Sequence, residues 1–137
     1  MTFLSLLLLY ALIFTFLVFF EALYTYYFYG FAYGFSSNRD KTAMPRTKFG
    51  LRVERTLQNH LENGAIAIPV LGAAAISGLE SSAAMTAGII YILMRVAFVF
   101  LYYAGVPMIR GGVWTVGNLS LLYIAYVLIS SGTVPLL

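Results

Sequence analysis

Long apolar runs separated by short polar segments dominate the chain, and this pattern predicts membrane-spanning helices. The first run covers residues 3 to 35 and carries a single charge, Glu21. Later apolar runs are interrupted by "GLESS" at 78–82 and by "GVPMIRGG" at 105–112. A spanning helix needs about 20 apolar residues. The pattern therefore predicts one all-α integral membrane domain, a four-helix bundle with spans at about 3–30, 50–77, 82–104 and 113–131.

Composition agrees with a protein that lies in lipid. Of the 137 residues, 61% are hydrophobic and 9% are charged, whereas soluble domains carry about 25% charged residues. Cysteine is absent, which excludes disulfides, thiolate metal sites and a cysteine nucleophile. Any thiol chemistry would need a thiol from the substrate, and we expect no metal site and no nucleic-acid partner. No Lys or Arg precedes the first run, so we expect a retained helix rather than a signal peptide.

The basic residues predict the orientation of the chain in the membrane. Every Lys and Arg except Arg95 falls in the connection from Ser36 to Lys48, at the start of the second span, or in the last connection. The positive-inside rule makes this side cytoplasmic and places both termini outside, in what we expect to be a bacterial inner membrane. Tyrosines at the end of the first span fit an interfacial belt, although each alone fits a lipid-facing position equally well: Tyr24, Tyr26, Tyr27, Tyr29 and Tyr33.

A polar stripe runs along the start of the second span. Its members are spaced by three, four and three residues, which places them on one helix face: Arg52, Arg55, Asn59 and Glu62. Glu54 and His60 lie off this stripe, and the sequence assigns no role to His60 or to Glu21. Two interpretations stay open, namely a helix that shows a polar face to water as it leaves the membrane, or a ligand site.

The third span carries a matching set of polar and aromatic residues: Tyr91, Arg95, Phe98 and Tyr102. A short turn near Gly78–Leu79 makes spans two and three antiparallel, so residues equally far from the turn lie at equal depth. Glu62 and Arg95 are such a pair, and we expect them to form a buried ion pair, either within one subunit or across a subunit interface. This pair could be functional or could only fix the helix register.

Arg55 and Tyr102 are also equally distant from that turn. Together with Arg52 and Asn59 they predict a cationic pocket just inside the bilayer, suited to a small anionic ligand with an apolar tail or reaction partner. Arg110 stands at the cytoplasmic mouth of this pocket. From its position alone, Arg110 could be simply an interfacial anchor.

Three motifs in order resemble one family. They are Arg55, Asn59, Glu62 and Asn63 in the pattern R-x3-N-x2-E-N; "YILMR" at 91–95 followed by Tyr102; and Arg110, Trp114 and Gly117 in R-x3-W-x2-G. Over residues 52 to 118 the chain resembles the membrane-associated proteins in eicosanoid and glutathione metabolism (the MAPEG family), which include microsomal glutathione transferases.

The resemblance implies a fold, a function and site residues. It implies a homotrimer of four-helix bundles that binds glutathione as co-substrate between subunits near the cytoplasmic face, and we expect the second span nearest the axis. The residues implied to bind glutathione are Arg52, Arg55, Asn59, Glu62 and Tyr102. Arg110 is implied to stabilise the glutathione thiolate.

Two functions are compatible with this resemblance. The first is a membrane glutathione transferase or peroxidase that acts on lipophilic electrophiles delivered from the bilayer lipids. The alternative is a non-catalytic lipid-binding protein or an accessory subunit of a larger membrane complex. The presence of Arg110 beside the other motif residues favours the enzyme, whereas the segment from Arg95 to Arg110, about one residue short, favours the alternative.

Overall fold

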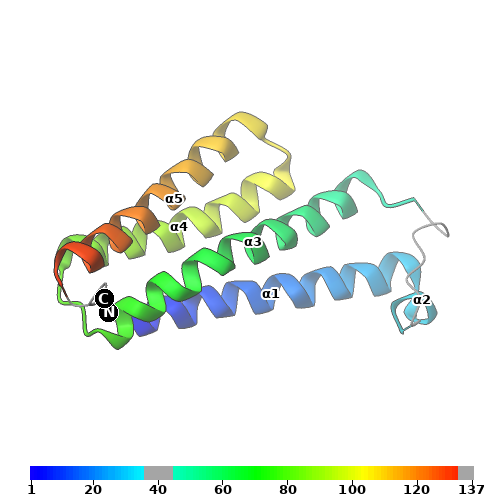
Figure 1. Cartoon of the computed structure of the whole chain (residues 1–137). Helices are drawn as coiled ribbons and strands as arrows, with labels where there is room; N and C mark the ends of the chain where they lie inside the picture. The colour runs from blue at the N-terminus through cyan, green and yellow to red at the C-terminus, as the bar shows by residue number, and fades with distance from the viewer. Residues whose placement is uncertain (36–44, 133–137) are drawn as a thin grey trace.

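A computed structural model describes residues 1–35 and 45–132. Within these residues the chain is all-α, as the sequence predicts, and contains no strand. Four long helices carry the fold, and one short helix follows the first of them (Figure 1): α1 (Phe3–Tyr29), α2 (Phe31–Phe35), α3 (Lys48–Ile76), α4 (Ser82–Ala104) and α5 (Pro107–Ser130). Arg39 and Lys41 of the predicted basic connection lie outside the described residues.

Local capping explains where most of these helices begin. The side chains of Thr2, Thr47 and Ser81 each accept a hydrogen bond from a backbone N–H three residues later, which satisfies a donor that the first helical turn leaves free. Helix α5 begins with Pro107, whose fixed φ and missing N–H suit the first helical position. Because this proline starts the helix, α5 begins at 107 rather than at the predicted 113, and Arg110 lies within a helix rather than in the connection.

The long helices pack as two pairs, α3 along α1 and α5 along α4 (Figure 1). The hydrophobic core lies toward the end that holds the N-terminus and the α3–α4 turn. It is formed by side chains from all four long helices and by Leu79 of the α3–α4 turn: Phe3, Leu6, Tyr10, Ala67, Leu71, Ala74, Leu79, Ala84, Ala87, Tyr91, Ile92, Leu121, Ile124 and Leu128. The opposite end contains most of the described charges.

Three helices, α1, α4 and α5, are long and apolar enough to cross a membrane. Helix α3 has 29 residues but is not among them, because its first half carries the polar stripe. It nevertheless packs lengthwise against α1 (Figure 1). That α3 forms the fourth span therefore stays a prediction.

Candidate functional site

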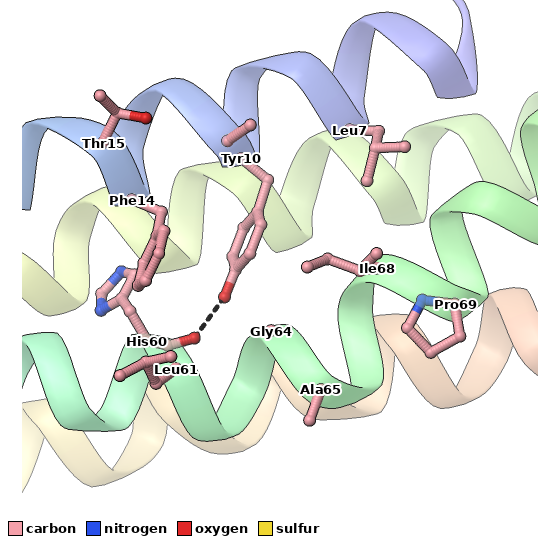
Figure 2. A pocket seen from close by; sticks show the side chains of 11 residues that line it. Leu7, Tyr10, Phe14, Thr15, His60, Leu61, Gly64, Ala65, Ile68 and Pro69 are labelled. Carbon is pink, nitrogen blue, oxygen red and sulfur yellow. Dashed lines mark hydrogen bonds between the residues drawn. The ribbon is translucent and has the colours of Figure 1, made fainter.

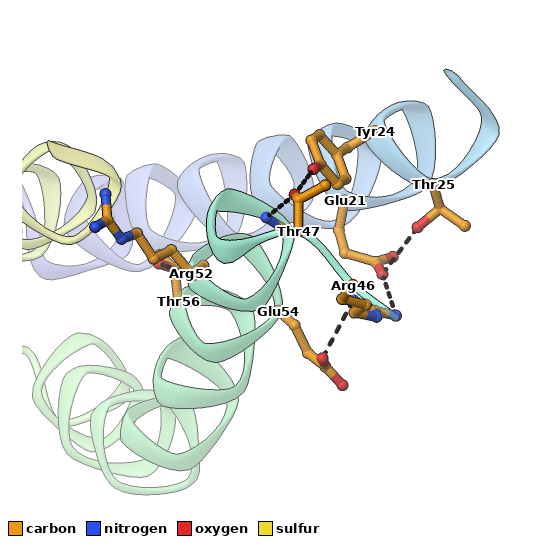
Figure 3. A network of polar contacts seen from close by, with 9 residues as sticks. Glu21, Tyr24, Thr25, Arg46, Thr47, Arg52, Glu54 and Thr56 are labelled. Atoms are coloured by element: carbon orange, nitrogen blue, oxygen red, sulfur yellow. Dashed lines mark hydrogen bonds and ion pairs between the residues drawn. The ribbon is translucent and has the colours of Figure 1, made fainter. Parts of the chain in front are cut away.

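An ion-pair network ties the start of α3 to α1 (Figure 3). Arg46 lies 3.4 Å from a carboxylate oxygen of Glu21 and 3.2 Å from one of Glu54. Thr25 donates a further hydrogen bond to Glu21 at 3.2 Å. Glu21 is the only charge in the first apolar run, so Arg46 supplies the opposite charge that the sequence did not identify. The network holds α3 at a fixed position beside α1.

The first turn of α3 is fixed by a second contact in the same region (Figure 3). The Thr47 hydroxyl accepts from the backbone N–H of Gly50 at 3.0 Å and also hydrogen-bonds the Tyr24 hydroxyl. A Cβ at Gly50 would lie 2.9 Å from the Tyr24 ring, so the absence of a side chain there permits this close packing. These contacts fix the first turn of α3, and with it the position of the basic residues that follow.

A cationic pocket of about 350 Å³ opens beside these turns. It is lined by residues of α3, of the end of α4 and of the start of α5: Lys48, Leu51, Arg52, Arg55, Tyr102, Gly105 and Arg110. Four of these carry positive charge and none carries negative charge. Like charges at short range repel, and an anion that enters the pocket relieves this repulsion. The pocket is suited to a small ligand with negatively charged groups.

Arg52 is held in this pocket by the C-terminus of α4. Its Nη1 donates a hydrogen bond to the carbonyl of Tyr103 at 3.2 Å. The last carbonyls of a helix carry partial negative charge and attract a cation. The guanidinium lies against Gly105, which has φ +79° and ends the helix. A Cβ at Gly105 would lie 2.5 to 2.6 Å from three guanidinium atoms, so only glycine accommodates both the backbone conformation and Arg52.

Arg110 is fixed over an aromatic ring of the same pocket. Its guanidinium carbon lies 4.2 Å from the centroid of the Tyr102 ring, in a cation–π contact. The side chain is half-buried and comes from the first turns of α5. Trp114 is one turn further along α5 and is 42% exposed. Trp114 is exposed, whereas Arg110 lines the pocket.

Arg95 lies outside the pocket and is 1% exposed. Its Nη2 donates to Asn59 Oδ1 at 2.9 Å and lies 3.0 Å from His60 Nδ1, which is also 3.0 Å from the Thr56 carbonyl. Its guanidinium carbon lies 4.9 Å from the Phe98 ring centroid. Glu62 is exposed and instead accepts a hydrogen bond from Gln58 at 3.2 Å. The expected pairing of Glu62 with Arg95 is therefore absent within the described chain, and their pairing across a subunit interface stays a prediction.

Glu62 and Arg95 do not pair within the chain because of the rotation of α3 about its own axis. Its buried face repeats about every 3.5 residues and is formed by Val53, Thr56, His60, Asn63, Ala67, Leu71 and Ala74. At 100° per residue, Glu62 points well away from that face. Equal depth in an antiparallel pair fixes the height of a side chain but not the direction in which it points. Helix α3 also packs more closely on α1 than on α4, which weakens the depth argument further.

The structure brings together four of the six predicted ligand or catalytic residues. Arg52, Arg55, Tyr102 and Arg110 line the cationic pocket, as the antiparallel spacing predicted for Arg55 and Tyr102. Asn59 and Glu62 do not line it within one chain. Asn59 is half-buried one turn beyond Arg55 and contacts Arg95.

His60, to which the sequence assigned no role, is fully buried at the junction of three helices. Its carbonyl accepts a hydrogen bond from the Tyr10 hydroxyl of α1 at 2.6 Å, and its Nδ1 lies 3.0 Å from Arg95 Nη2 of α4 and 3.0 Å from the Thr56 carbonyl. The signal that could have identified it is its place in the buried repeat of α3, seven residues after Val53 and seven before Ala67. A polar residue within an otherwise apolar helix face needs a partner.

A second, largely apolar groove of about 690 Å³ lies between α1 and α3 (Figure 2). Figure 2 shows Tyr10 reaching across the helix interface to the His60 carbonyl beside this groove. Leu7 and Phe14 of α1 and Ile68 and Pro69 of α3 contribute to its walls. Its chemistry suits a hydrocarbon ligand, whereas the cationic pocket suits an anionic one.

Helices of membrane-spanning length define a multi-pass integral membrane protein, and a cationic pocket lies at one end of them. The model of the MAPEG family matches residues 2–130, and the chain belongs to this family. No curated protein and no solved structure is significantly similar to the chain. The resemblance seen in three short motifs is therefore confirmed over almost the whole sequence.

Proposed function

We propose that this protein is a membrane glutathione transferase or peroxidase that acts on lipophilic electrophiles. The observation that carries the proposal is the convergence of Lys48, Arg52, Arg55 and Arg110 in one pocket that no acid lines among the described residues. Glutathione has two carboxylates and a thiol, so this set of donors fits its chemistry. Membership of the MAPEG family fits the same activity.

In this proposal the cations bind the carboxylates, and Arg110 acts on the sulfur. A free thiol titrates near pH 8.5, and a neighbouring guanidinium can lower this to about 7 or below. Arginine stays protonated in proteins, so it acts by electrostatic stabilisation and not as a base. The contact with Tyr102 supports this role, because it holds the Arg110 guanidinium toward the pocket rather than toward the membrane surface.

We further propose that glutathione binds between subunits of a homotrimer, with α3 nearest the axis and the pocket on the cytoplasmic side of a bacterial inner membrane. Within one chain Arg55, Gln58 and Glu62 are not enclosed by the other helices, and Arg55 and Glu62 are exposed on α3. If α3 spans the membrane, a charge that faces lipid costs about 2.5–3.5 kcal/mol on insertion scales, so a neighbouring chain or a polar ligand should cover this face. Glu62 and Asn59 would then reach glutathione at the interface. A monomeric mass in mild detergent would contradict the trimer.

The experiment measures conjugation of glutathione to a chlorinated nitroaromatic at neutral pH. The thiolate sulfur bonds to the ring carbon and chloride leaves. We expect Arg110→Ala to lower turnover about 100- to 1000-fold, as loss of one preorganised donor typically does. Arg110→Lys should also lower turnover, because the compact ammonium of lysine replaces the rigid, planar guanidinium with its several N–H donors. Met108→Ala, near the same helix start and 90% exposed, is the matched control and should leave the rate unchanged.

Thiolate formation gives an independent measurement. Adding glutathione to the wild type should produce the ultraviolet difference absorbance of a thiolate, and Arg110→Ala should abolish it while glutathione still binds. Equal turnover in wild type, Arg110→Ala and Arg110→Lys would make Arg110 an interfacial anchor only.

The alternative function is a non-catalytic lipid-binding protein or an accessory subunit of a larger complex. The apolar groove between α1 and α3 favours this alternative, because its walls suit a hydrocarbon chain without any glutathione chemistry. Absence of both glutathione binding and conjugation in the wild type would support it over the enzyme.

A further inference from the structure

The cationic pocket lies at the depth of the lipid headgroups. It is lined by Tyr102 near the end of α4 and by Arg110 in the first turns of α5. Both helices are long and apolar enough to span the membrane, so the turn between them, at 105–106, lies outside the hydrocarbon region. Tyr102 and Arg110 are within four residues of that turn, which is about 6 Å along a helix axis. The pocket cations are therefore at the height of lipid phosphates.

Exposed apolar side chains lie beside these cations. Lys48 and Arg55 are both exposed, and Leu51, which lines the pocket between them on α3, is 42% exposed. Ile109, the residue before Arg110, is 61% exposed. A ligand that enters the pocket from the side of the membrane thus meets positive charge next to hydrocarbon surface. This combination suits an amphiphile with an anionic headgroup.

The positive charge of the pocket exceeds what a small ligand neutralises. The salt bridges of the described residues involve Arg46 and none of the four pocket cations. Glutathione, the co-substrate proposed above, has two carboxylates and one ammonium, so its net negative charge is one as the thiol and two as the thiolate. Even with this ligand bound, part of the positive charge would remain without an anion. A further anionic group would relieve the repulsion among these cations.

Anionic phospholipids supply such a group at this depth. Arginine binds phosphate oxygens through paired N–H donors, and lysine binds them as a point charge. Basic pockets between spanning helices accordingly bind anionic headgroups. The pocket also discriminates among lipids, because no acid lines it. The ammonium of a zwitterionic headgroup would meet only cations there, whereas phosphatidylglycerol adds a neutral glycerol to its phosphate.

We propose that the cationic pocket is a binding site for an anionic phospholipid, with the phosphate at Lys48 and Arg52 and the acyl chains along Leu51 and Ile109. Lys48 is the first residue of α3 and lines the pocket one helical turn before Arg52. The Arg52 guanidinium uses Nη1 for the Tyr103 carbonyl, which leaves other N–H groups for a phosphate. The lipid site does not depend on the proposed enzyme activity, because the cations lack an acidic partner among the described residues whichever small ligand binds.

Trp114 allows the lipid to be measured directly. It is the only tryptophan of the chain, it is exposed, and it lies one turn after Arg110 on α5. Bromine atoms on lipid acyl chains quench tryptophan fluorescence on contact. The purified full-length protein is therefore reconstituted into bilayers that mix phosphatidylglycerol and phosphatidylcholine, with one of the two lipids brominated at a time. The two quenching curves give the relative affinity of the two lipids beside Trp114.

The wild type should prefer phosphatidylglycerol about 10- to 30-fold. Two basic residues near an anionic group contribute about 1 kcal/mol each, and 1.4 kcal/mol is tenfold. Lys48→Gln removes one of them and should lower the preference about 5-fold. Gln58→Glu is the matched control, since it changes the net charge by the same amount at an exposed position of α3. It lies about 15 Å further along the helix, beyond the screening length at physiological salt, and should leave the preference unchanged.

Three results would overturn the proposal. The first is equal affinity of the wild type for the two lipids. The second is an equal loss of preference in Lys48→Gln and Gln58→Glu, which would show a response to net charge alone. The third is loss of the preference on adding millimolar inorganic phosphate at constant ionic strength, which would assign the site to a soluble phosphate. The measurement contains no glutathione, so failure of the proposed transferase activity would leave its result unaffected.

Discussion

Gly105 is the position where a single methyl group should disrupt the cationic pocket. It ends α4 with φ +79°, and Val106 donates from its backbone N–H to the Leu101 carbonyl at 3.0 Å. A left-handed conformation costs a residue with a Cβ about 1–2 kcal/mol. At Gly105 the new Cβ would also lie 2.5 Å from the Arg52 guanidinium carbon, so the guanidinium must leave the Tyr103 carbonyl.

Loss of that charge-assisted hydrogen bond adds about 1.5 kcal/mol to the free-energy cost of Gly105→Ala. This is the low end for such bonds, because Arg52 is half-exposed. Gly78 provides the matched control. It follows the end of α3 with φ +63°, the next residue donates to the Ala74 carbonyl, and a Cβ added at Gly78 would meet no atom within 4 Å. Gly78→Ala should therefore show the backbone cost alone, and Gly105→Ala should cost about 1.5 kcal/mol more.

The assay is equilibrium unfolding of the purified protein by titration of a denaturing detergent into mild-detergent micelles, followed by circular dichroism. Repeating both glycine substitutions in an Arg52→Ala background isolates the contact. The two costs should then become equal, because Gly105 no longer has a guanidinium to displace. The reasoning is refuted if Gly105→Ala and Gly78→Ala cost the same in the wild-type background, or if their difference survives removal of Arg52.

Two further predictions concern the packing that supports the pocket. Arg46→Ala leaves Glu21, whose side chain is 13% exposed, without its cation and should destabilise the protein by about 3 kcal/mol. Adding Glu21→Gln should recover much of this stability in the same unfolding assay. No recovery would show that the unpaired Glu21 charge is not the cause. Gly88→Ala places a Cβ in steric conflict with the Leu6 side chain and should cost about 1–3 kcal/mol. Gly72→Ala, with open space, should be neutral or stabilising, so equal effects of the two would contradict the α1–α4 contact.

The sequence predicted the helices well because lipid imposes a simple rule on them. An apolar run of sufficient length must form a helix, and the interruptions in "GLESS" and "GVPMIRGG" mark the turns. The α4 bounds agree with the predicted 82–104, and the largest difference is the start of α5. Pro107 reads as a turn residue in an isolated sequence. Proline is equally common as the first residue of a helix. Whether Pro107 lies in a turn or starts α5 depends on the Gly105 cap before it.

The members of the pocket were largely predictable, whereas the partners of Arg95 were not. Spacing by three and four residues places Arg52 and Arg55 on one face, and antiparallel depth brings Tyr102 to the same height. Predicting the partners of Arg95 also requires the rotation of α3 about its own axis. That rotation follows from the packing of α3 on α1, to which Tyr10 and its hydrogen bond to His60 contribute. No spacing rule within α3 contains this information.

Arg95 and the arginines of the cationic pocket differ in burial. Arg95 is enclosed, and its hydrogen bonds go to the amide and imidazole of α3, so it cannot exchange them for a ligand without opening the helix interface. Arg52, Arg55 and Arg110 line an open pocket without an acid among its lining residues, so an entering anion need not displace an internal salt bridge. The pocket cations are therefore not neutralised by an acid among the residues that line the pocket. This difference argues for a ligand that supplies the negative charge itself, which is the property that the proposed co-substrate has.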